Sequence, residues 1–194
     1  MSSFKAFLKK YADVFKAIVV LTVICLVVSA ALAATNEVTK AKIAEIDATA
    51  ATQAMEALIP ESTYQKVEGE NDFYIAKSGD KINGYIITNS AKGYGGDVKV
   101  MTAFDDAGTV IGVNILSVAD ETPGLGQNVT KENFYNQYKG KNEKLTVVKN
   151  GAKDGEINAV TGATITSRAV TTAINDSMDM LQKYLSANTG KEVQ

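Results

Sequence analysis

The sequence predicts an α+β fold in which an antiparallel sheet with packed helices follows one N-terminal transmembrane helix. Three features support this prediction: an uncharged apolar run near the N-terminus, several short strand-like segments in the middle of the chain, and a long amphipathic segment near its end. The 194 residues are 45% hydrophobic and 22% charged, the composition of a folded protein with room for one ordinary domain and an appendage.

The apolar run covers residues 17–36, which are 20 residues without a charge. As a helix with a rise of ~1.5 Å per residue it is about 30 Å long, enough to cross a bilayer once. Four lysines and one aspartate precede the run, so the positive-inside rule places the N-terminus in the cytoplasm. We therefore expect a cytoplasmic segment at 1–16, an anchor in the lipid bilayer of the cytoplasmic membrane at 17–36, and an extracytoplasmic domain at 37–194.

A cleavable signal peptide is the alternative interpretation of this run, because Ala31-Leu32-Ala33 matches the small-x-small pattern of a cleavage site. The apolar core of a signal peptide is typically ~7–15 residues long, and the run exceeds that length. A retained anchor is therefore the preferred interpretation.

After the anchor, helical spacing gives way to strand-like patterns. Residues 37–58 contain no glycine or proline and precede Pro60, so we expect a helix that ends before this proline. Turn signals between short β-like runs predict antiparallel hairpins with strands at 73–76, 82–88, 98–104 and 110–116. Alternation of apolar residues along 98–104 predicts that one face of this strand is buried.

The last part of the chain is expected to contain a short helix at 130–138, a strand at 145–148 and a final helix that begins near Thr166 or Ser167. One side of the final helix is predicted to be buried. Its apolar residues are Val170, Ala173, Ile174, Leu181 and Leu185.

Composition excludes several classes of site. The chain contains no histidine, and its only cysteine, Cys25, lies inside the apolar run. A Ser-His-Asp or Cys-His nucleophilic site requires histidine, and zinc, haem and iron–sulfur sites normally require histidine or several cysteines. We therefore expect no nucleophilic site of these kinds and no metal site, and any redox chemistry requires an organic cofactor.

The charge of the expected domain also bears on its partners. Four of the 20 basic and one of the 22 acidic residues lie in the first 36 positions, which leaves 16 and 21 and a net charge of −5. This mild acidity argues against nucleic acid as a partner.

A hydroxyl-rich run at 158–167, Asn-Ala-Val-Thr-Gly-Ala-Thr-Ile-Thr-Ser, lies just before the final amphipathic segment. At a helix N-terminus, backbone N–H groups and the helix dipole favour a bound phosphate. With Asp154-Gly155 before it, the run resembles the acceptor motif of the FMN-binding domain family. This resemblance implies that a flavin transferase attaches FMN, through a phosphoester, to the threonine that closes Thr-Gly-Ala-Thr, here Thr164. The alternative role of Thr164 is a helix-capping hydroxyl.

Two glycine-containing loops, at 92–97 and 121–126, are ordinary turns when each is taken alone. Their order in the chain extends the resemblance: a Gly-Tyr-Gly-Gly loop, two strands, a Glu-Thr-Pro-Gly-Leu-Gly loop and then Thr-Gly-Ala-Thr. This order is similar to that of the G subunits of Rnf complexes, and the C subunits of Na⁺-pumping NADH:quinone reductases share the motifs. Many relatives carry a histidine shortly before the second loop, where this chain has Ala119-Asp120.

The resemblance implies an electron-carrying subunit of a membrane-bound, ion-translocating ferredoxin:NAD⁺ oxidoreductase complex, with other membrane subunits as partners and no substrate site of its own. FMN would be bound at the helix N-terminus and in the two loops. The residues expected to contact it are Thr161, Gly162, Ala163, Thr164, Ile165, Thr166, Ser167, Tyr94, Gly95, Glu121, Thr122, Gly124 and Leu125. The alternatives are a stand-alone, membrane-anchored surface flavoprotein for extracellular electron transfer, and a cofactor-free anchored interaction module.

Overall fold

The computed structural model of this protein describes residues 11–69 and 72–189, which divide into two compact units with a boundary between Thr49 and Ala50. Helix α2 (Ala12–Leu58) contains this boundary. The first ten residues of the expected cytoplasmic segment lie outside the described residues.

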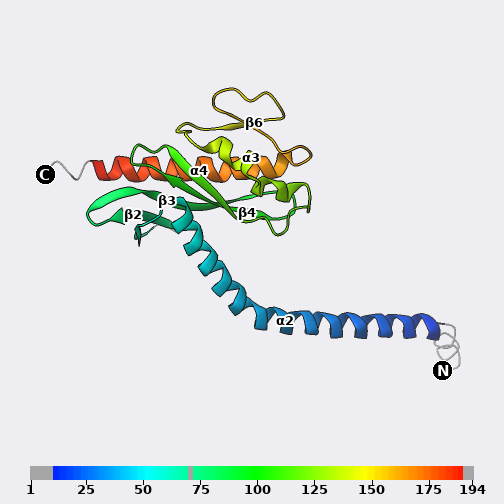
Figure 1. Cartoon of the computed structure of the whole chain (residues 1–194). Helices are drawn as coiled ribbons and strands as arrows, with labels where there is room; N and C mark the ends of the chain where they lie inside the picture. The colour runs from blue at the N-terminus through cyan, green and yellow to red at the C-terminus, as the bar shows by residue number, and fades with distance from the viewer. Residues whose placement is uncertain (1–10, 70–71, 190–194) are drawn as a thin grey trace. The chain divides into compact units, whose positions relative to one another are not determined.

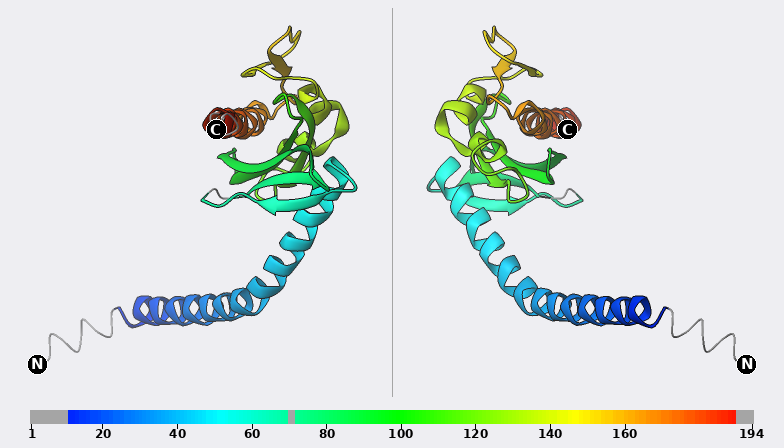
Figure 2. Two further views of the ribbon diagram at one scale, coloured as in Figure 1. Left: turned by 90° about the vertical axis from the view of Figure 1, so that its left-hand side faces the viewer. Right: turned by 90° about the vertical axis from the view of Figure 1, so that its right-hand side faces the viewer.

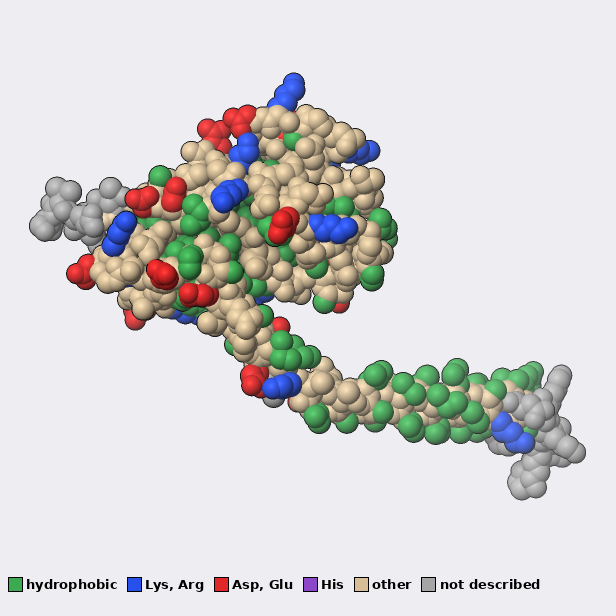
Figure 3. Space-filling model, viewed as in Figure 1, with side chains coloured by type: hydrophobic (Ala, Val, Ile, Leu, Met, Phe, Trp, Pro, Cys, Tyr) green, Lys and Arg blue, Asp and Glu red, His purple; other side chains and the backbone are tan. Residues whose placement is uncertain are grey.

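The first unit consists of helix α2 up to Thr49. The expected anchor and the helix expected after it are continuous, because no glycine or proline interrupts the chain between them, and α2 ends before Pro60. Every described side chain from Val14 to Thr49 is exposed, and apolar side chains follow one another along the face seen in Figure 3. Within the described part of the chain, α2 is the one helix long and apolar enough to cross a membrane. A helix that is apolar without a buried face requires lipid or another protein to cover it.

The second unit is built around a five-stranded antiparallel sheet in which the strands follow one another in chain order (Figures 1 and 2). The strands are β1 (Thr63–Lys66), β2 (Phe73–Ser78), β3 (Lys81–Lys92), β4 (Asp97–Phe104) and β5 (Val110–Ser117). The predicted α+β class is confirmed, and so are the four predicted strands, each of which extends beyond its expected range.

After β5 the chain forms three short helical segments and a small second sheet. The segments η1 (Gly126–Thr130), α3 (Glu132–Tyr135) and η2 (Asn136–Tyr138) replace the single helix expected at 130–138. Strands β6 (Thr146–Val148) and β7 (Glu156–Asn158) pair in parallel. The sequence patterns missed β1, a polar and mostly exposed edge strand, and β7, which has only three residues.

Both faces of the main sheet are covered. Helix α4 (Thr164–Thr189) packs against β3 and β4, and its buried side shares a core with Val100 and Phe104. On the other face, the end of α2 within the second unit contributes Met55 to a core with Met101 and its neighbours. The predicted buried face of β4 is confirmed at Val98, Val100 and Phe104. Met101 and Ala103, on the opposite face, are buried as well, against the end of α2.

Helix α4 begins at Thr164, earlier than the expected start near Thr166 or Ser167. Gly162 has a φ of +78°, which favours glycine, and the N–H of Ala163 donates to the C=O of Val160. This tight turn ends immediately before Thr164, so Thr164 is the first residue of the helix. The predicted buried side is confirmed at Val170, Ala173, Ile174 and Leu181, and Leu185 is partly buried.

Candidate functional site

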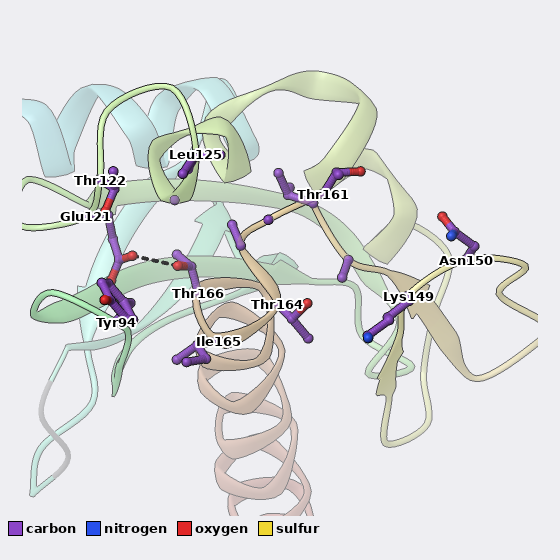
Figure 4. A pocket seen from close by; sticks show the side chains of 15 residues that line it. Tyr94, Glu121, Thr122, Leu125, Lys149, Asn150, Thr161, Thr164, Ile165 and Thr166 are labelled. Carbon is purple, nitrogen blue, oxygen red and sulfur yellow. Dashed lines mark hydrogen bonds between the residues drawn. The ribbon is translucent and has the colours of Figure 1, made fainter.

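A cavity of about 810 Å³ lies at the N-terminus of helix α4. Three segments that are far apart in the sequence contribute to it: the loop before β4, the loop after β5, and the segment from β6 to the first turn of α4 (Figure 4). Its lining residues are Tyr94, Glu121, Thr122, Leu125, Gly126, Lys149, Asn150, Ala159, Val160, Thr161, Gly162, Ala163, Thr164, Ile165 and Thr166.

The first turn of α4 presents unpaired polar groups to this cavity. The N–H groups of Thr164, Ile165 and Thr166 have no hydrogen-bond acceptor within the described structure, as is usual for the first residues of a helix. The half-buried hydroxyl of Thr164 also makes no hydrogen bond among the described residues, so the structure gives no support to the capping alternative. Three unpaired N–H groups and an unpaired hydroxyl therefore lie together in the first turn of α4, in the cavity wall.

Ser167, expected to contact FMN, does not line the cavity. Its side chain is fully buried, accepts a hydrogen bond from the N–H of Val160 at 3.0 Å and donates one to the C=O of Ala163 at 2.9 Å. The N–H of Ser167 also donates to the C=O of Ala163. Ser167 is therefore used within the turn that precedes α4, and its N–H is not available to a phosphate.

Glu121 connects the two loops to α4. Its side chain is 3% exposed. One carboxylate oxygen, Oε1, accepts hydrogen bonds from the N–H groups of Tyr94 at 2.7 Å and Gly95 at 3.1 Å. The other, Oε2, accepts one from the hydroxyl of Thr166 at 2.6 Å, which Figure 4 shows as a dashed line. The carboxylate therefore holds together all three segments that form this side of the cavity.

The glycines of the two loops serve packing within the protein. A Cβ on Gly95 or Gly96 would collide with Asp120, so the absence of side chains lets the first loop lie directly against the second. Gly95 and Gly124, both expected to contact FMN, do not line the cavity, and Gly124 forms a turn with a φ of +75°. The glycines of the first loop therefore allow the close approach of another part of the protein.

Large apolar side chains surround the opening. Tyr94 is 71% exposed, Ile165 52% and Leu125 46%, although all three lie on the cavity wall. In Figure 4, Tyr94 and Ile165 lie on the side of Glu121, whereas Thr164 lies on the side of Lys149 and Asn150. The cavity wall thus contains exposed apolar side chains as well as polar groups.

Lys149 and Asn150 were missed by the sequence reasoning, together with Gly126, Ala159 and Val160. Lys149 is the one cationic side chain among the lining residues. It follows β6, and the parallel pairing of β6 with β7 brings it close to the segment that enters α4. The parallel pairing of two three-residue strands leaves no local pattern in the sequence. The strand expected at 145–148 was therefore the one sequence signal near Lys149 and Asn150.

Asp154, part of the Asp154-Gly155 pair before the hydroxyl-rich run, does not line the cavity. Its exposed carboxylate accepts a hydrogen bond from the ammonium of Lys141 at 2.6 Å and one from the N–H of Gly155. The hydrogen bond from Lys141 and its positive charge hold the pKa of Asp154 below its ordinary value of 3.8. In the structure, Asp154 connects the loop between β6 and β7 to Lys141, which precedes β6.

The lining residues fit FMN chemically. The volume of about 810 Å³ is within the ~300–1,000 Å³ of typical small-molecule pockets. Unpaired N–H groups at a helix N-terminus and a nearby lysine suit a phosphate, while tyrosine, leucine and isoleucine side chains suit a planar ring. Among the residues described, no group of three or more His, Cys, Asp or Glu is arranged to hold a metal ion.

Comparison with known proteins points to the same chemistry. The family described as FMN-binding domain matches residues 93–179, a range that contains the first loop except residue 92, the whole second loop and the start of α4. The chain is 35% identical to the G subunit of the proton-translocating ferredoxin:NAD(+) oxidoreductase complex of Clostridium ljungdahlii, over 84% of this chain and 89% of that protein. It is also 35% identical to the G subunit of the Na(+)-translocating ferredoxin:NAD(+) oxidoreductase complex of Acetobacterium woodii, over 87% of this chain and 92% of that protein.

A solved structure shares the architecture. The C subunit of the Na(+)-translocating NADH-quinone reductase of Parabacteroides distasonis aligns with a TM-score of 0.55 and 25% identity, over 71% of this chain and 83% of that chain.

Proposed function

Because this chain belongs to the family of G subunits of ion-translocating ferredoxin:NAD⁺ oxidoreductase complexes, we propose that it is the electron-carrying subunit of such a complex and relays electrons through covalently bound FMN. The proposed attachment is a phosphoester to the hydroxyl of Thr164. One observation carries this proposal: a free hydroxyl stands at the first residue of α4, inside the cavity, beside three unpaired N–H groups.

Attachment requires an activated flavin and a flavin transferase as a maturation partner. The oxygen of the Thr164 hydroxyl would attack the FMN phosphorus of a flavin dinucleotide and form a new P–O bond. The pyrophosphate bond would break, a nucleoside monophosphate would leave, and the hydroxyl proton would pass to a base on the transferase. Gly162 and Ala163, which have little or no side chain, leave the hydroxyl accessible to this second protein.

After attachment, different residues of the cavity would contact the phosphate and the ring of FMN. The N–H groups of Thr164, Ile165 and Thr166 would donate to the phosphate, and Lys149 would provide a positive charge. Tyr94 and Leu125 offer apolar surface to the ring. The cofactor supplies the one- and two-electron chemistry, and the protein supplies its position and electrostatic surroundings.

The attachment site is tested by peptide mass spectrometry on the full chain, produced with and without a flavin transferase. Thr164→Ala should abolish covalent flavin, because the nucleophile is lost, and Thr164→Ser should retain some, because a hydroxyl remains. Thr161→Ala is the matched control, since Thr161 also lines the cavity and is exposed. An adduct that maps to Thr161 or persists in Thr164→Ala would contradict the assignment, and a colourless protein would favour a cofactor-free module.

The proposal also includes an orientation. The four lysines before the apolar part of α2 favour a cytoplasmic N-terminus and a domain on the outer face of the cytoplasmic membrane. Protease added to right-side-out spheroplasts should then trim the C-terminal domain. Protection in spheroplasts combined with digestion in inverted vesicles would reverse the orientation.

Other membrane subunits are the proposed redox partners. A flavin on the outer face cannot exchange electrons with a cytoplasmic nicotinamide through ~30 Å of hydrocarbon, so further redox centres must lie between them. Mild solubilisation should therefore co-purify this chain with other membrane proteins of the complex. Purification as a flavin-bearing monomer from native membranes would favour a stand-alone surface flavoprotein.

A further inference from the structure

Glu121 is a buried carboxylate that the proposed attachment of FMN does not require. Its side chain is 3% exposed, and none of the ion pairs found in the described part of the chain involves it. A buried charge without a partner of opposite sign is costly unless hydrogen bonds compensate it. Hydrogen bonds must therefore account for its stability in the cavity wall.

The hydrogen bonds around Glu121 suit an anion. Oε1 accepts from two backbone N–H groups, of Tyr94 and Gly95, and Oε2 accepts from the hydroxyl of Thr166. Backbone N–H groups can only donate, and an ionised carboxylate can only accept. Three donors on one carboxylate stabilise its negative charge without a cation.

Gly93 and Gly126 lack side chains where the Glu121 carboxylate lies. A Cβ on Gly93 would collide with Oε1, and a Cβ on Gly126 would collide with Oε2. A Cβ on Gly126 would also lie 3.1 Å from the hydroxyl oxygen of Thr166. The position of the carboxylate is thus set from two sides by backbone, in addition to its hydrogen bonds.

We propose that Glu121 is a positioning residue that holds a fixed negative charge in the cavity wall and thereby lowers the reduction potential of the bound FMN. This inference rests on the proposed function, because Glu121 lines the cavity assigned to FMN. Reduction of FMN takes up two electrons and one or two protons, so the reduced flavin carries the same charge as the oxidised flavin or one more negative charge. A nearby anion that water does not screen opposes this gain of electron density.

The main test is Glu121→Gln in the full chain, purified in detergent with its FMN, with the midpoint potential measured against a reference dye. Dithionite is the reductant and is oxidised to sulfite. The amide has nearly the shape of the carboxylate, can still accept from the N–H groups, and can donate to Thr166. At a fixed potential near pH 8 we expect at least a tenfold rise in the ratio of reduced to oxidised flavin, which is ~30 mV for a two-electron couple.

Asp120→Asn is the matched control for loss of charge. Asp120 precedes Glu121 in the chain but is exposed, so water and salt screen it. Its removal should shift the flavin ratio much less than Glu121→Gln does. Equal shifts in the two variants would show that the effect belongs to total charge and would overturn the assignment to Glu121.

Thr166 gives a second test that keeps the charge. Thr166→Val removes the hydroxyl that donates to Oε2, so the carboxylate becomes less neutralised and the potential should fall. Thr166→Ser retains the hydroxyl and should match the wild type. If Glu121→Gln does not fold, a lower potential in Thr166→Val than in Thr166→Ser still supports the fixed charge, and an equal or higher potential overturns it.

The sign of the shifts in reduction potential distinguishes an effect of the Glu121 charge from an effect of its hydrogen bonds on the shape of the cavity. If Glu121 acts through its charge, Glu121→Gln should raise the reduction potential and Thr166→Val should lower it. If Glu121 only holds the loops together, both variants should loosen the cavity and shift the potential in the same direction. Shifts of the same sign, or no shift in flavin-bearing protein, would overturn the inference. Failure of the wild-type chain to bind flavin would instead refute the proposed function.

Discussion

Helix α2 up to Thr49 and helix α4 are both long, but they differ in what covers their apolar side chains. Along α4, apolar residues recur on one side and are buried against the sheet. Along α2 from Val14 to Thr49, every described side chain is exposed, large apolar residues included. The distribution of apolar residues around a helix, rather than their number, therefore indicates whether it packs within its own chain or requires another environment.

The difference has consequences for where substitutions act. In α4, a side chain is part of a packed core, so its loss reduces the free energy of unfolding of the domain. In the first unit, the same kind of side chain has no contact surface within its own unit. Its loss should affect only insertion into the membrane or contacts with other subunits.

Removal of residues 1–36 should have the largest effect. The domain keeps the end of α2 that packs on the sheet, so it should fold as a soluble protein, but it loses its anchor and no longer supports turnover of the complex. The measurement is the ferredoxin-dependent reduction of NAD⁺ by membranes of a complemented deletion strain. A chain in which residues 17–36 are replaced by 20 leucines is the control for anchoring alone. Normal activity of the soluble form would contradict the comparison of the two helices.

A truncation within α4 should lower stability where the same change in α2 does not. Ile174 is fully buried, so Ile174→Ala should reduce the free energy of unfolding by about 2–5 kcal/mol, since it removes contacts and leaves a cavity. Leu26 is 66% exposed, and Leu26→Ala should leave the unfolding of the domain unchanged. Denaturant unfolding of both variants in the same detergent measures the contrast. Equal losses would show that the first unit also contributes to the core.

A smaller effect is expected at the buried hydrogen bond between Tyr138 and Thr171, whose oxygens are 2.7 Å apart. Thr171 also donates to the C=O of Ser167, so Tyr138 is the donor in the pair. Thr171→Val leaves the buried Tyr138 hydroxyl without a partner and should cost about 1–3 kcal/mol, whereas Tyr138→Phe should cost about 0.5–1.5 kcal/mol. Thermal unfolding of the two variants checks this order, and a larger loss for Tyr138→Phe would contradict it.

Tyr138 also predicts a pH dependence. Burial raises the pKa of Tyr138 above its ordinary value of 10.0. The unfolded chain therefore releases this proton at a lower pH than the folded chain, and stability should fall as the pH rises above 10.0. Tyr138→Phe should make this alkaline decline shallower. An unchanged slope in denaturant titrations at successive pH values would argue against the buried tyrosine as its source.

The smallest effect is expected at the ion pair of Lys141 and Asp154. The Asp154 side chain is fully exposed, and exposed ion pairs contribute little to stability. Asp154→Ala should leave the unfolding midpoint unchanged near neutral pH. Because its folded pKa is lowered, any contribution should be present at neutral pH and lost in acid. A reduced yield of FMN adduct in this variant, with unchanged stability, would assign Asp154 to recognition by the flavin transferase.

Sequence patterns predicted some residues of the site and missed others. The helix N-terminus at Thr164 and the two loops were identified from motifs, and the structure brings these segments to one cavity. Attachment of FMN to Thr164 stays a prediction. Lys149 was not identified, because it reaches the cavity through the pairing of two short parallel strands. Ser167 was expected in the site but is used in the turn before α4.

Features that depend on neighbours along the chain could be predicted from the amino-acid pattern. These are the apolar span of α2, the hairpins of the sheet, the buried side of α4 and the order of the motifs, all of which follow from periodicity, turn residues and composition. Packing between distant segments determines which loops meet, which faces of β4 are covered, and that Glu121 lies beside Thr166. The two residues are 45 positions apart, and their hydrogen bond exists only because the sheet and α4 pack together. Contacts between distant segments depend on packing, and local patterns do not encode them.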